Sequence, residues 1–391
     1  MRTPLHIAVL ALVLIVAACA AAQEKEWLQY RVSANPENDG VSVYYRSVES
    51  TAEAPAGVAL PESSGFDIRY GRWKTPMAKA GFLWMAVARS RQKGDFDRLY
   101  VDSKCDGSLS GEKAIKATAT DSNYTRFGPI KITFQGDDGP IVYHMVVECA
   151  QYEPEHIRIY MHSACWYQST VNVGGKDYPI ALIDYNSNGA FNDTSMDLSQ
   201  MDQIAIGSGD SRKLFGLGKY ISIDGKLYNP DVSRDGACVA FAPGEDVPMA
   251  TVKVSPDITS LSLSGENGQL DFQPSGGKAD VPAGKWIVRN WEIARDDSTG
   301  AKWLMTGSYF PEESIFEVAE GKEASPNIGE PVISTLSVRE SSGEYSISVS
   351  YEGKSGENVS MQRSGENPTA PKIRIKNADG SYDKSFATTY G

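Results

Sequence analysis

The sequence lacks the short motifs that identify many hydrolases, metalloproteases and nucleotide-binding enzymes. It contains no Gly-x-Ser-x-Gly turn, no His-Glu-x-x-His motif and no phosphate-binding loop. Histidine is scarce, with 4 in 391 residues, and His144, His156 and His162 fall within one short stretch, which limits a dispersed catalytic triad. Carboxylate pairs for glycoside hydrolysis cannot be recognised here, because their separation depends on the fold. No catalytic residue is therefore assigned.

Basic residues are also in deficit. Lys and Arg number 38 against 50 Asp and Glu, which gives a formal net charge of −12. Nucleic acid requires patches of Lys and Arg to neutralise its phosphates, and the sequence contains no such patch. The composition therefore argues against a nucleic-acid partner and makes cation binding the simpler expectation.

Only one long apolar run is present, and it lies at the N-terminus. Arg2 precedes the run 7–18, which is too short for a stable membrane span and predicts an export signal over residues 1–22. Two processing sites are open: Val-Ala-Ala-Cys at 16–19 resembles the bacterial lipobox, whereas the alanines at 20–22 suit an ordinary signal peptidase. The mature protein is expected in the cell envelope or secreted, with membrane contact only through a lipid on Cys19.

Cysteine is rare and widely spaced. Beyond the signal there are four, Cys105, Cys149, Cys165 and Cys238, an even number that permits two disulfides with three possible connectivities. No Cys-x-x-Cys pair occurs, so no structural zinc site is predicted. Strand alternation puts Cys149 and Cys165 on a core face but at opposite ends of a strand pair. They are expected either to pair elsewhere or to be buried thiols.

Amphipathic helices are absent too, and the pattern predicts a mostly β, multidomain protein. Short alternating runs separated by Asp-Gly and Gly-Gly turns are typical of antiparallel sheets. We expect an extended segment over 23–65, a β-rich domain over 66–245, a β-sandwich over 246–325 and an immunoglobulin-like sandwich over 326–391. Pro282-x-Gly284-x-Trp286-x-Val288 resembles a hairpin common in bacterial sandwich domains of the prealbumin-like kind.

The runs 141–149 and 157–165 form the clearest predicted strand pair. Folding them about Glu153 places His144 across from His162 on the polar face. Such a pair is open to two interpretations, a weak transition-metal or pH-sensitive site and an ordinary pair on a sheet face. The segment 41–45 is also predicted to be a strand.

The strongest motif is the segment 184–193, which follows the apolar run 180–183. Its side-chain oxygens at the first, third and fifth positions and its glycine at the sixth have the spacing of a calcium loop. An acidic residue is missing at Ser195, so Asp193 or Asp197 must supply the last ligand. The alternative is an Asx-rich turn that needs no ion. The candidate calcium ligands are Asp184, Asn186, Asn188, the carbonyl of Ala190, Asn192 and Asp193.

A weaker copy of this motif lies upstream. Aligning Asp102 with Asp184 places Gly107 on Gly189 and Leu109 on Phe191. Lys104 puts a cation where a ligand oxygen belongs, so binding here requires that Lys104 turn outward. The candidate ligands of this second site are Asp102, Asp106, Ser108 and Glu112.

Taken together, these features resemble exported bacterial proteins that join a β-rich, calcium-loop domain to small sandwich domains. The preferred expectation is a calcium-stabilised scaffold in the cell envelope that binds a protein or polysaccharide and has a binding or structural function rather than a catalytic one. The alternative is a secreted hydrolase acting on carbohydrate, with the sandwiches as accessories.

The two functions predict different surfaces. A hydrolase requires a cleft lined by convergent carboxylates and several tryptophans, whereas a scaffold leaves its tryptophans buried.

Overall fold

The computed structural model describes residues 25–60, 65–121, 123–137, 139–151, 157–312 and 314–389. These residues form 32 β-strands and three short 3₁₀ helices, so the prediction of a mostly β, multi-sheet protein is confirmed. None of the helices in the described part is long and apolar enough to cross a membrane. The predicted export signal and Cys19 lie outside the described residues.

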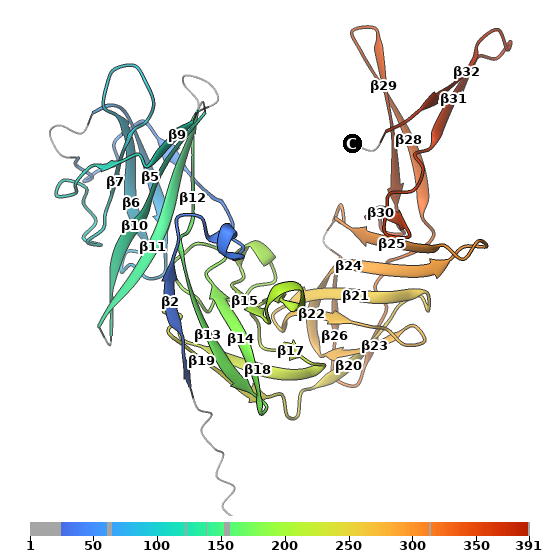
Figure 1. The fold of residues 1–391 in the computed structure, drawn as a ribbon, viewed down its shortest axis with the longest axis horizontal. Coiled ribbons are helices and arrows are strands. Elements are labelled where there is room, and N and C mark those ends of the chain that lie inside the picture. The colour runs from blue at the N-terminus through green and yellow to red at the C-terminus, as the bar shows by residue number, and fades with distance from the viewer. Residues whose placement is uncertain are drawn as a thin grey trace, which may run out of the picture.

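The first unit is a sandwich of two antiparallel five-stranded sheets, ordered β3-β12-β11-β10-β9 and β4-β5-β6-β7-β8 (Figure 1). Alternate side chains of both sheets, such as Met85 and Met145, are buried between them. The strands are β3 (Arg46–Val48), β4 (Ser50–Thr51), β5 (Phe66–Lys74), β6 (Phe82–Arg89), β7 (Arg98–Val101), β8 (Ile115–Lys116), β9 (Ala119–Asp121), β10 (Tyr124–Gly136), β11 (Gly139–Gln151) and β12 (Ile157–Ser163).

The second unit repeats this plan with sheets ordered β16-β15-β14-β13-β2 and β1-β19-β18-β17. Its inward side chains, among them Leu182, Ile204 and Val239, join the same continuous core as those of the first sandwich. The strands are β1 (Glu26–Trp27), β2 (Gln29–Val32), β13 (Cys165–Val173), β14 (Lys176–Ile183), β15 (Gln203–Ile206), β16 (Lys213–Gly216), β17 (Ile221–Ile223), β18 (Lys226–Val232) and β19 (Cys238–Pro243).

The two sandwiches meet at Ala164. This buried residue alone separates β12, in the first sandwich, from β13, in the second. The N-terminal segment runs alongside in the opposite direction, because β2 pairs with β13 and β3 pairs with β12. The described residues 25–60 therefore supply edge strands to both sandwiches. The strand predicted over 41–45 is wrong, because none of these residues is in a strand and β3 begins at Arg46.

The third unit packs a small sheet, β23-β20-β27, against an eight-stranded sheet ordered β22-β21-β24-β25-β30-β29-β28, with β26 pairing to β24. Its core holds Trp286 and Trp291. The hairpin predicted over 282–288 is wrong, because the chain passes there from β23 in the small sheet to β24 in the large one, and the Trp286 indole donates to the Pro282 carbonyl at 2.9 Å across this step. The strands of this core are β20 (Met249–Lys253), β21 (Ile258–Gly265), β22 (Gly268–Phe272), β23 (Lys278–Pro282), β24 (Gly284–Asp296), β25 (Lys302–Ser308), β26 (Ile315–Val318) and β27 (Glu323–Ala324).

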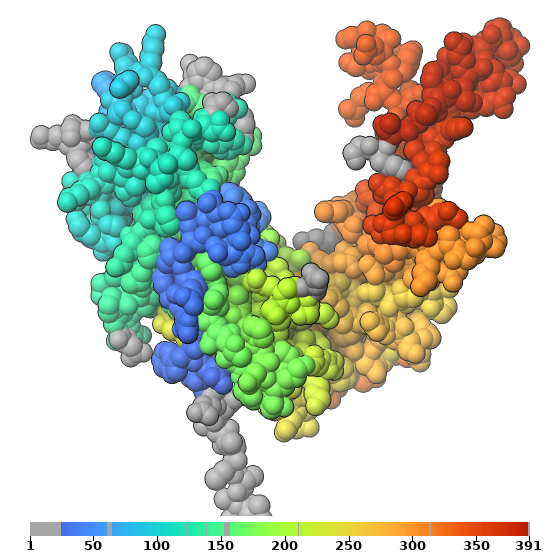
Figure 2. Space-filling view, viewed as in Figure 1, coloured from blue at the N-terminus to red at the C-terminus, as the bar shows by residue number. Residues whose placement is uncertain are grey.

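The C-terminal strands extend this unit. β28 (Ile333–Ser341), β29 (Glu344–Glu352) and β30 (Asn358–Arg363) lengthen the eight-stranded sheet, whereas β31 (Lys372–Lys376) and β32 (Asp383–Ala387) form a separate hairpin. Figure 2 shows these C-terminal strands, β28 to β32, and the first sandwich on opposite sides of an open space above the second sandwich.

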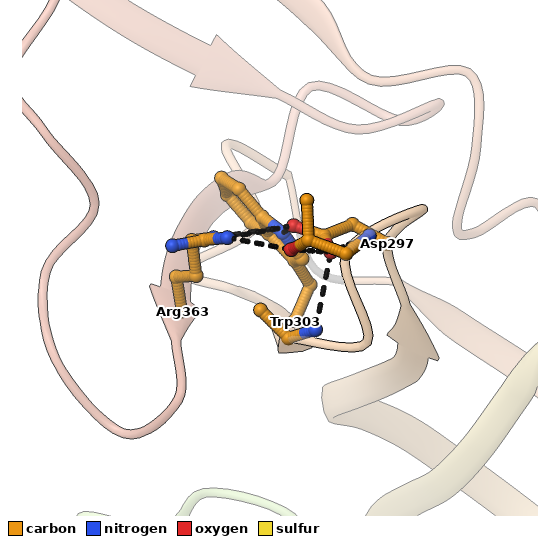
Figure 3. Close-up of polar contacts among 5 residues, drawn as sticks. Asp297, Trp303 and Arg363 are labelled. Carbon is orange, nitrogen blue, oxygen red and sulfur yellow. Dashed lines mark hydrogen bonds and ion pairs between the residues drawn. The ribbon is translucent and has the colours of Figure 1, made fainter.

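A surface carboxylate joins β30 to the β24–β25 hairpin. The Asp297 side chain accepts hydrogen bonds from the Thr299 and Ala301 amides, from the Trp303 indole at 3.0 Å and from the Arg363 guanidinium at 3.1 Å (Figure 3). These donors, with the Thr299 hydroxyl first among them, hold the pKa of Asp297 well below its usual value.

We predict that Asp297→Ala accelerates amide hydrogen exchange in β25 and β30, because five donor groups on four residues lose their shared acceptor. The lowered pKa means that the carboxylate stabilises the fold fully above the ordinary aspartate value of 3.8, and that this stabilisation is lost as the pH falls toward the lower folded-state pKa. Exchange is measured near neutral pH. Asp296→Ala, at an exposed neighbouring position, is the control, and equal exchange in both variants contradicts the prediction.

Candidate cation loops

The loop at 184–193, called the main loop below, begins where β14 ends at buried Ile183. The buried Asp184 carboxylate accepts hydrogen bonds from the amides of Asn188 at 3.1 Å and Gly189 at 2.7 Å. The backbone is left-handed at Ser187, with φ of 56°, and at Gly189, with φ of 93°. The Asp184 side chain therefore closes the loop on itself, as an Asx turn does.

The two asparagines of the loop converge on Asp193. Asn186 Nδ2 and Asn188 Nδ2 both donate to Asp193 Oδ2, at 3.0 and 2.7 Å. Asn188 Oδ1 accepts from the Ala190 amide, but Asn186 Oδ1 is buried and has no hydrogen-bond partner among the described residues. A buried amide oxygen without a partner costs about 1–3 kcal/mol, so this atom is a plausible cation ligand on chemical grounds.

Asp202 is a member of this cluster that the sequence motif did not indicate. Its carboxylate is buried and accepts hydrogen bonds from the amides of Tyr185 at 3.1 Å and Asp193 at 2.8 Å. It immediately precedes β15, which pairs antiparallel with β14. Asp202 falls outside the calcium-loop spacing. The one sequence signal for it is its position at the end of the connection between β14 and β15, directly before the second strand.

Burial and mutual repulsion perturb these carboxylates. Burial raises the pKa of Asp184 to about 7, despite the hydrogen bonds that oppose the rise. Burial, followed by the charges of Asp184 and Asp193, raises the pKa of Asp202 well above its usual range. A bound cation would favour the ionised forms of such groups.

The described residues contain no group of three or more His, Cys, Asp or Glu side chains that could hold a metal ion. A cation at the main loop would therefore need amide and carbonyl oxygens as well as carboxylates, which is usual for calcium. Asp197 caps the 3₁₀ helix Leu198–Gln200 by accepting from the Ser199 amide, and Asn192 is exposed. The structure thus brings together four of the predicted ligands. Asn186 and Asn188 donate to Asp193, and Asp184 accepts from the Asn188 amide. The Ala190 amide joins them through Asn188 Oδ1.

The loop after β7, called the first loop below, has the same construction. Asp102 accepts from the amides of Asp106 at 3.0 Å and Gly107 at 2.8 Å, and Asp106 accepts from Ser108. Positive φ occurs at Cys105 and Gly107, which match Ser187 and Gly189. The predicted repeat of the two loops is confirmed by these hydrogen bonds.

The first loop also has a counterpart of Asp202. Glu112 accepts from the Ser103 amide and hydroxyl, as Asp202 accepts from the Tyr185 amide. Lys104 is exposed and donates to the Gly111 carbonyl at 3.1 Å, so its ammonium group is held by the end of the loop. Burial raises the pKa of Asp102, as it does that of Asp184.

The main loop differs from the first loop in lying at the junction of the two sandwiches. The Ser187 hydroxyl accepts from the Ser163 amide at 3.0 Å, next to Ala164, and the Ser187 carbonyl accepts from the Trp73 indole at 2.8 Å. Arg46 donates to the Asn186 carbonyl at 2.9 Å. Ser163, Trp73 and Arg46 all belong to the first sandwich, so the main loop of the second sandwich is hydrogen-bonded to its neighbour.

The predicted histidine pair is wrong in its register, because His162 lies opposite Val146. His144 instead contacts the Tyr30 hydroxyl at 2.8 Å. The buried His162 ring lies 2.8 Å from the Ser163 carbonyl through Nδ1, while its Nε2 is 3.3 Å from the Arg126 guanidinium. His156 lies outside the described residues.

The four cysteines that the structure describes form no disulfide. Cys105, Cys149, Cys165 and Cys238 are all free, and the last three are buried. Of the two alternatives left open for Cys149 and Cys165, the buried thiol is the one observed. Burial raises the pKa of Cys149 to about 12 and that of Cys165 to about 11, which keeps both thiols protonated and unreactive.

The tryptophans are mainly core residues. Trp73, Trp286 and Trp291 are fully buried, Trp166 is 5% exposed, and Trp84 and Trp303 are half-buried. A groove with Trp73 and Trp84 in its lining contains one carboxylate, Glu49. This lining lacks the paired carboxylates that glycoside hydrolysis requires.

We predict that Ser187→Ala lowers the free energy of unfolding by about 1–2 kcal/mol, because the buried Ser163 amide loses its acceptor. The matched control is Cys105→Ala in the first loop, which has the same left-handed backbone but only a weak contact from its thiol to the Thr133 carbonyl at 3.7 Å. Urea denaturation compares the two variants. A loss for Cys105→Ala as large as that for Ser187→Ala contradicts a special role for the junction.

A second prediction concerns acid sensitivity. Burial, with the nearby Arg126 charge, lowers the pKa of His162 below 6.5. The unfolded chain therefore binds a proton that the native state does not, and stability falls as the pH drops below the unfolded value of about 6.5. His162→Gln should reduce this slope in urea titrations between about pH 5 and 7.5. A slope identical to that of the wild type contradicts the assignment.

Comparison with known proteins returned no matching family model, no matching curated protein and no matching solved structure.

Proposed function

We propose that the protein is an exported cell-envelope scaffold stabilised by calcium at the main loop, and that it binds a partner rather than catalysing a reaction. The observation that carries this proposal is the buried, unpartnered Oδ1 of Asn186 within an acidic loop. Asp184 and Asp202 are buried in the same hydrogen-bonded cluster, and their charges repel each other. A divalent cation would satisfy the amide oxygen and offset the repulsion in one step.

The position of the loop gives calcium a structural task. A cation that stiffens residues 184–193 would also stiffen the contacts of Ser187 and Asn186 with the first sandwich. Few carboxylates and several neutral oxygens predict an affinity on the order of 0.1 to 1 mM, as in extracellular modules. Such a site is filled outside the cell and acts as a constant clamp, which agrees with the export signal predicted from the sequence.

The first loop is the weaker candidate. Lys104 occupies the position that Asn186 has in the main loop, and its ammonium group bonds to Gly111. An ammonium group cannot ligate a cation, so Asp102, Asp106, Ser108 and Glu112 would have to bind without a third-position ligand. The hydrogen bonds of Asp102 and Glu112 to the backbone close this loop without an ion.

The alternative function, a secreted hydrolase acting on carbohydrate, has less support. It requires two convergent carboxylates near exposed aromatic side chains. Most of the tryptophans are buried, and the groove that includes Trp84 has Glu49 as the one carboxylate in its lining. Binding of a polysaccharide without cleavage fits this surface better.

The calcium proposal predicts a thermal shift. With a dissociation constant of about 0.5 mM, 10 mM Ca²⁺ should stabilise the sandwiches by about 2 kcal/mol, which raises their melting temperature by roughly 4 °C. Asp202→Asn and Asn186→Leu should both abolish the shift, whereas Asp197→Asn, in the neighbouring helix cap, should retain it. The measurement is calorimetry of the mature protein in EDTA and in calcium. The absence of a shift in the wild type would refute calcium binding.

A further inference from the structure

A groove of 390 Å³ lies in the first sandwich where β4 and the segment 46–50 meet β5 and β6. It is bordered by more basic than acidic side chains: Arg46, Arg72 and Lys74 against Glu49. None of the three basic residues forms an ion pair among the described residues. On a protein with a net charge of −12, a groove with three basic side chains outside the ion pairs of the described residues, and with Glu49 as the one acidic group in its lining, points to an anionic ligand.

The same groove has an aromatic floor. Arg72 on β5 pairs with Trp84 on β6, and Lys74 pairs with Phe82, so these four side chains share one face of the sheet. The Arg72 guanidinium lies over the Phe82 ring at 5.0 Å, and the Phe82 and Trp84 rings meet edge to face at 5.3 Å. These contacts hold Arg72 and Trp84 in place before any ligand arrives.

Both loops are attached to residues that line this groove. The main loop accepts hydrogen bonds from Arg46 and Trp73 through the carbonyls of Asn186 and Ser187. The first loop donates from the Asp102 amide to the Trp84 carbonyl at 2.9 Å. The two Asp-closed loops are thus each hydrogen-bonded to residues of the groove lining.

We infer that this groove binds an acidic polysaccharide, with uronate carboxylates at Arg72 and Lys74 and a sugar ring against Trp84. Apolar ring faces of sugars pack on indole, and the Ser50 and Thr51 hydroxyls in the lining suit sugar hydroxyls. A peptide of Asp and Glu alone would use the basic groups but has no ring to cover Trp84. This inference rests on the proposed binding function and names its ligand class.

Isothermal titration calorimetry with trigalacturonate tests the assignment, with maltotriose as the neutral sugar and triglutamate as the acidic peptide. The wild type should bind trigalacturonate at least tenfold more tightly than either comparator, and added NaCl should weaken the binding. The double change Arg72→Gln and Lys74→Gln should weaken trigalacturonate binding at least tenfold. Trp84→Leu should also weaken this binding, and the loss that it causes should depend less on the salt concentration. Lys285→Gln, an exposed charge change on β24, is the control and should bind as the wild type does.

The outcomes separate this inference from the calcium proposal. Tight binding of triglutamate assigns the groove to acidic peptides and overturns the polysaccharide. No binding of trigalacturonate at millimolar concentration, or binding unaffected by the Arg72 and Lys74 changes, overturns the groove itself. If calcium still raises the melting temperature in those cases, the proposed scaffold stands and only the ligand assignment fails. Circular dichroism of each variant shows that the fold is retained.

Discussion

The arrangement of the two N-terminal sandwiches depends on one buried carboxylate. Asp184 gathers the amides of Asn188 and Gly189, and this closure forces Ser187 into a left-handed conformation. In that conformation Ser187 presents its carbonyl to Trp73 and its hydroxyl to the Ser163 amide. Gly189 packs against Thr75, Met77 and Phe134 of the first sandwich, where an added Cβ would lie only 3.3–3.4 Å from their atoms. The main loop thereby connects the second sandwich to the first.

The two loops show how one plan serves two purposes. Each joins neighbouring antiparallel strands, β7 to β8 and β14 to β15. Each is closed by the aspartate at its first position, Asp102 or Asp184. The differences lie in single positions: Lys104 replaces Asn186, and Cys105 replaces Ser187. A lysine removes a neutral oxygen and adds a cation, while a thiol offers a weaker hydrogen bond than a hydroxyl. Both loops therefore close on themselves, but the main loop also keeps an unsatisfied oxygen among the described residues and is hydrogen-bonded to the first sandwich.

Local sequence pattern predicted the parts of this structure that depend on near neighbours. Alternating runs separated by Gly-Gly turns were expected to form antiparallel strands, and the turn at Gly174-Gly175 joins β13 to β14 in this way. What the pattern missed depends on distant contacts. Asp202 reaches the loop only because β15 pairs with β14, and the register that separates His144 from His162 was set by the whole β11–β12 ladder and not by the turn. β5 was missed, although it carries Arg72 and Lys74, because its buried and exposed residues follow no simple alternation.

The near-continuous strand from β12 into β13 has a mechanical consequence. A tension applied along residues 157–173 would pass through Ala164 without meeting a flexible linker. The backbone hydrogen bonds to β11 and β14 run perpendicular to that direction. Many of them would therefore be loaded together in shear and would not break one after another. Beside Ala164, Ser187 ties the strand to the main loop at its weakest point, where it leaves one sheet and enters the next. The two sandwiches would then bear load as a single stiff rod.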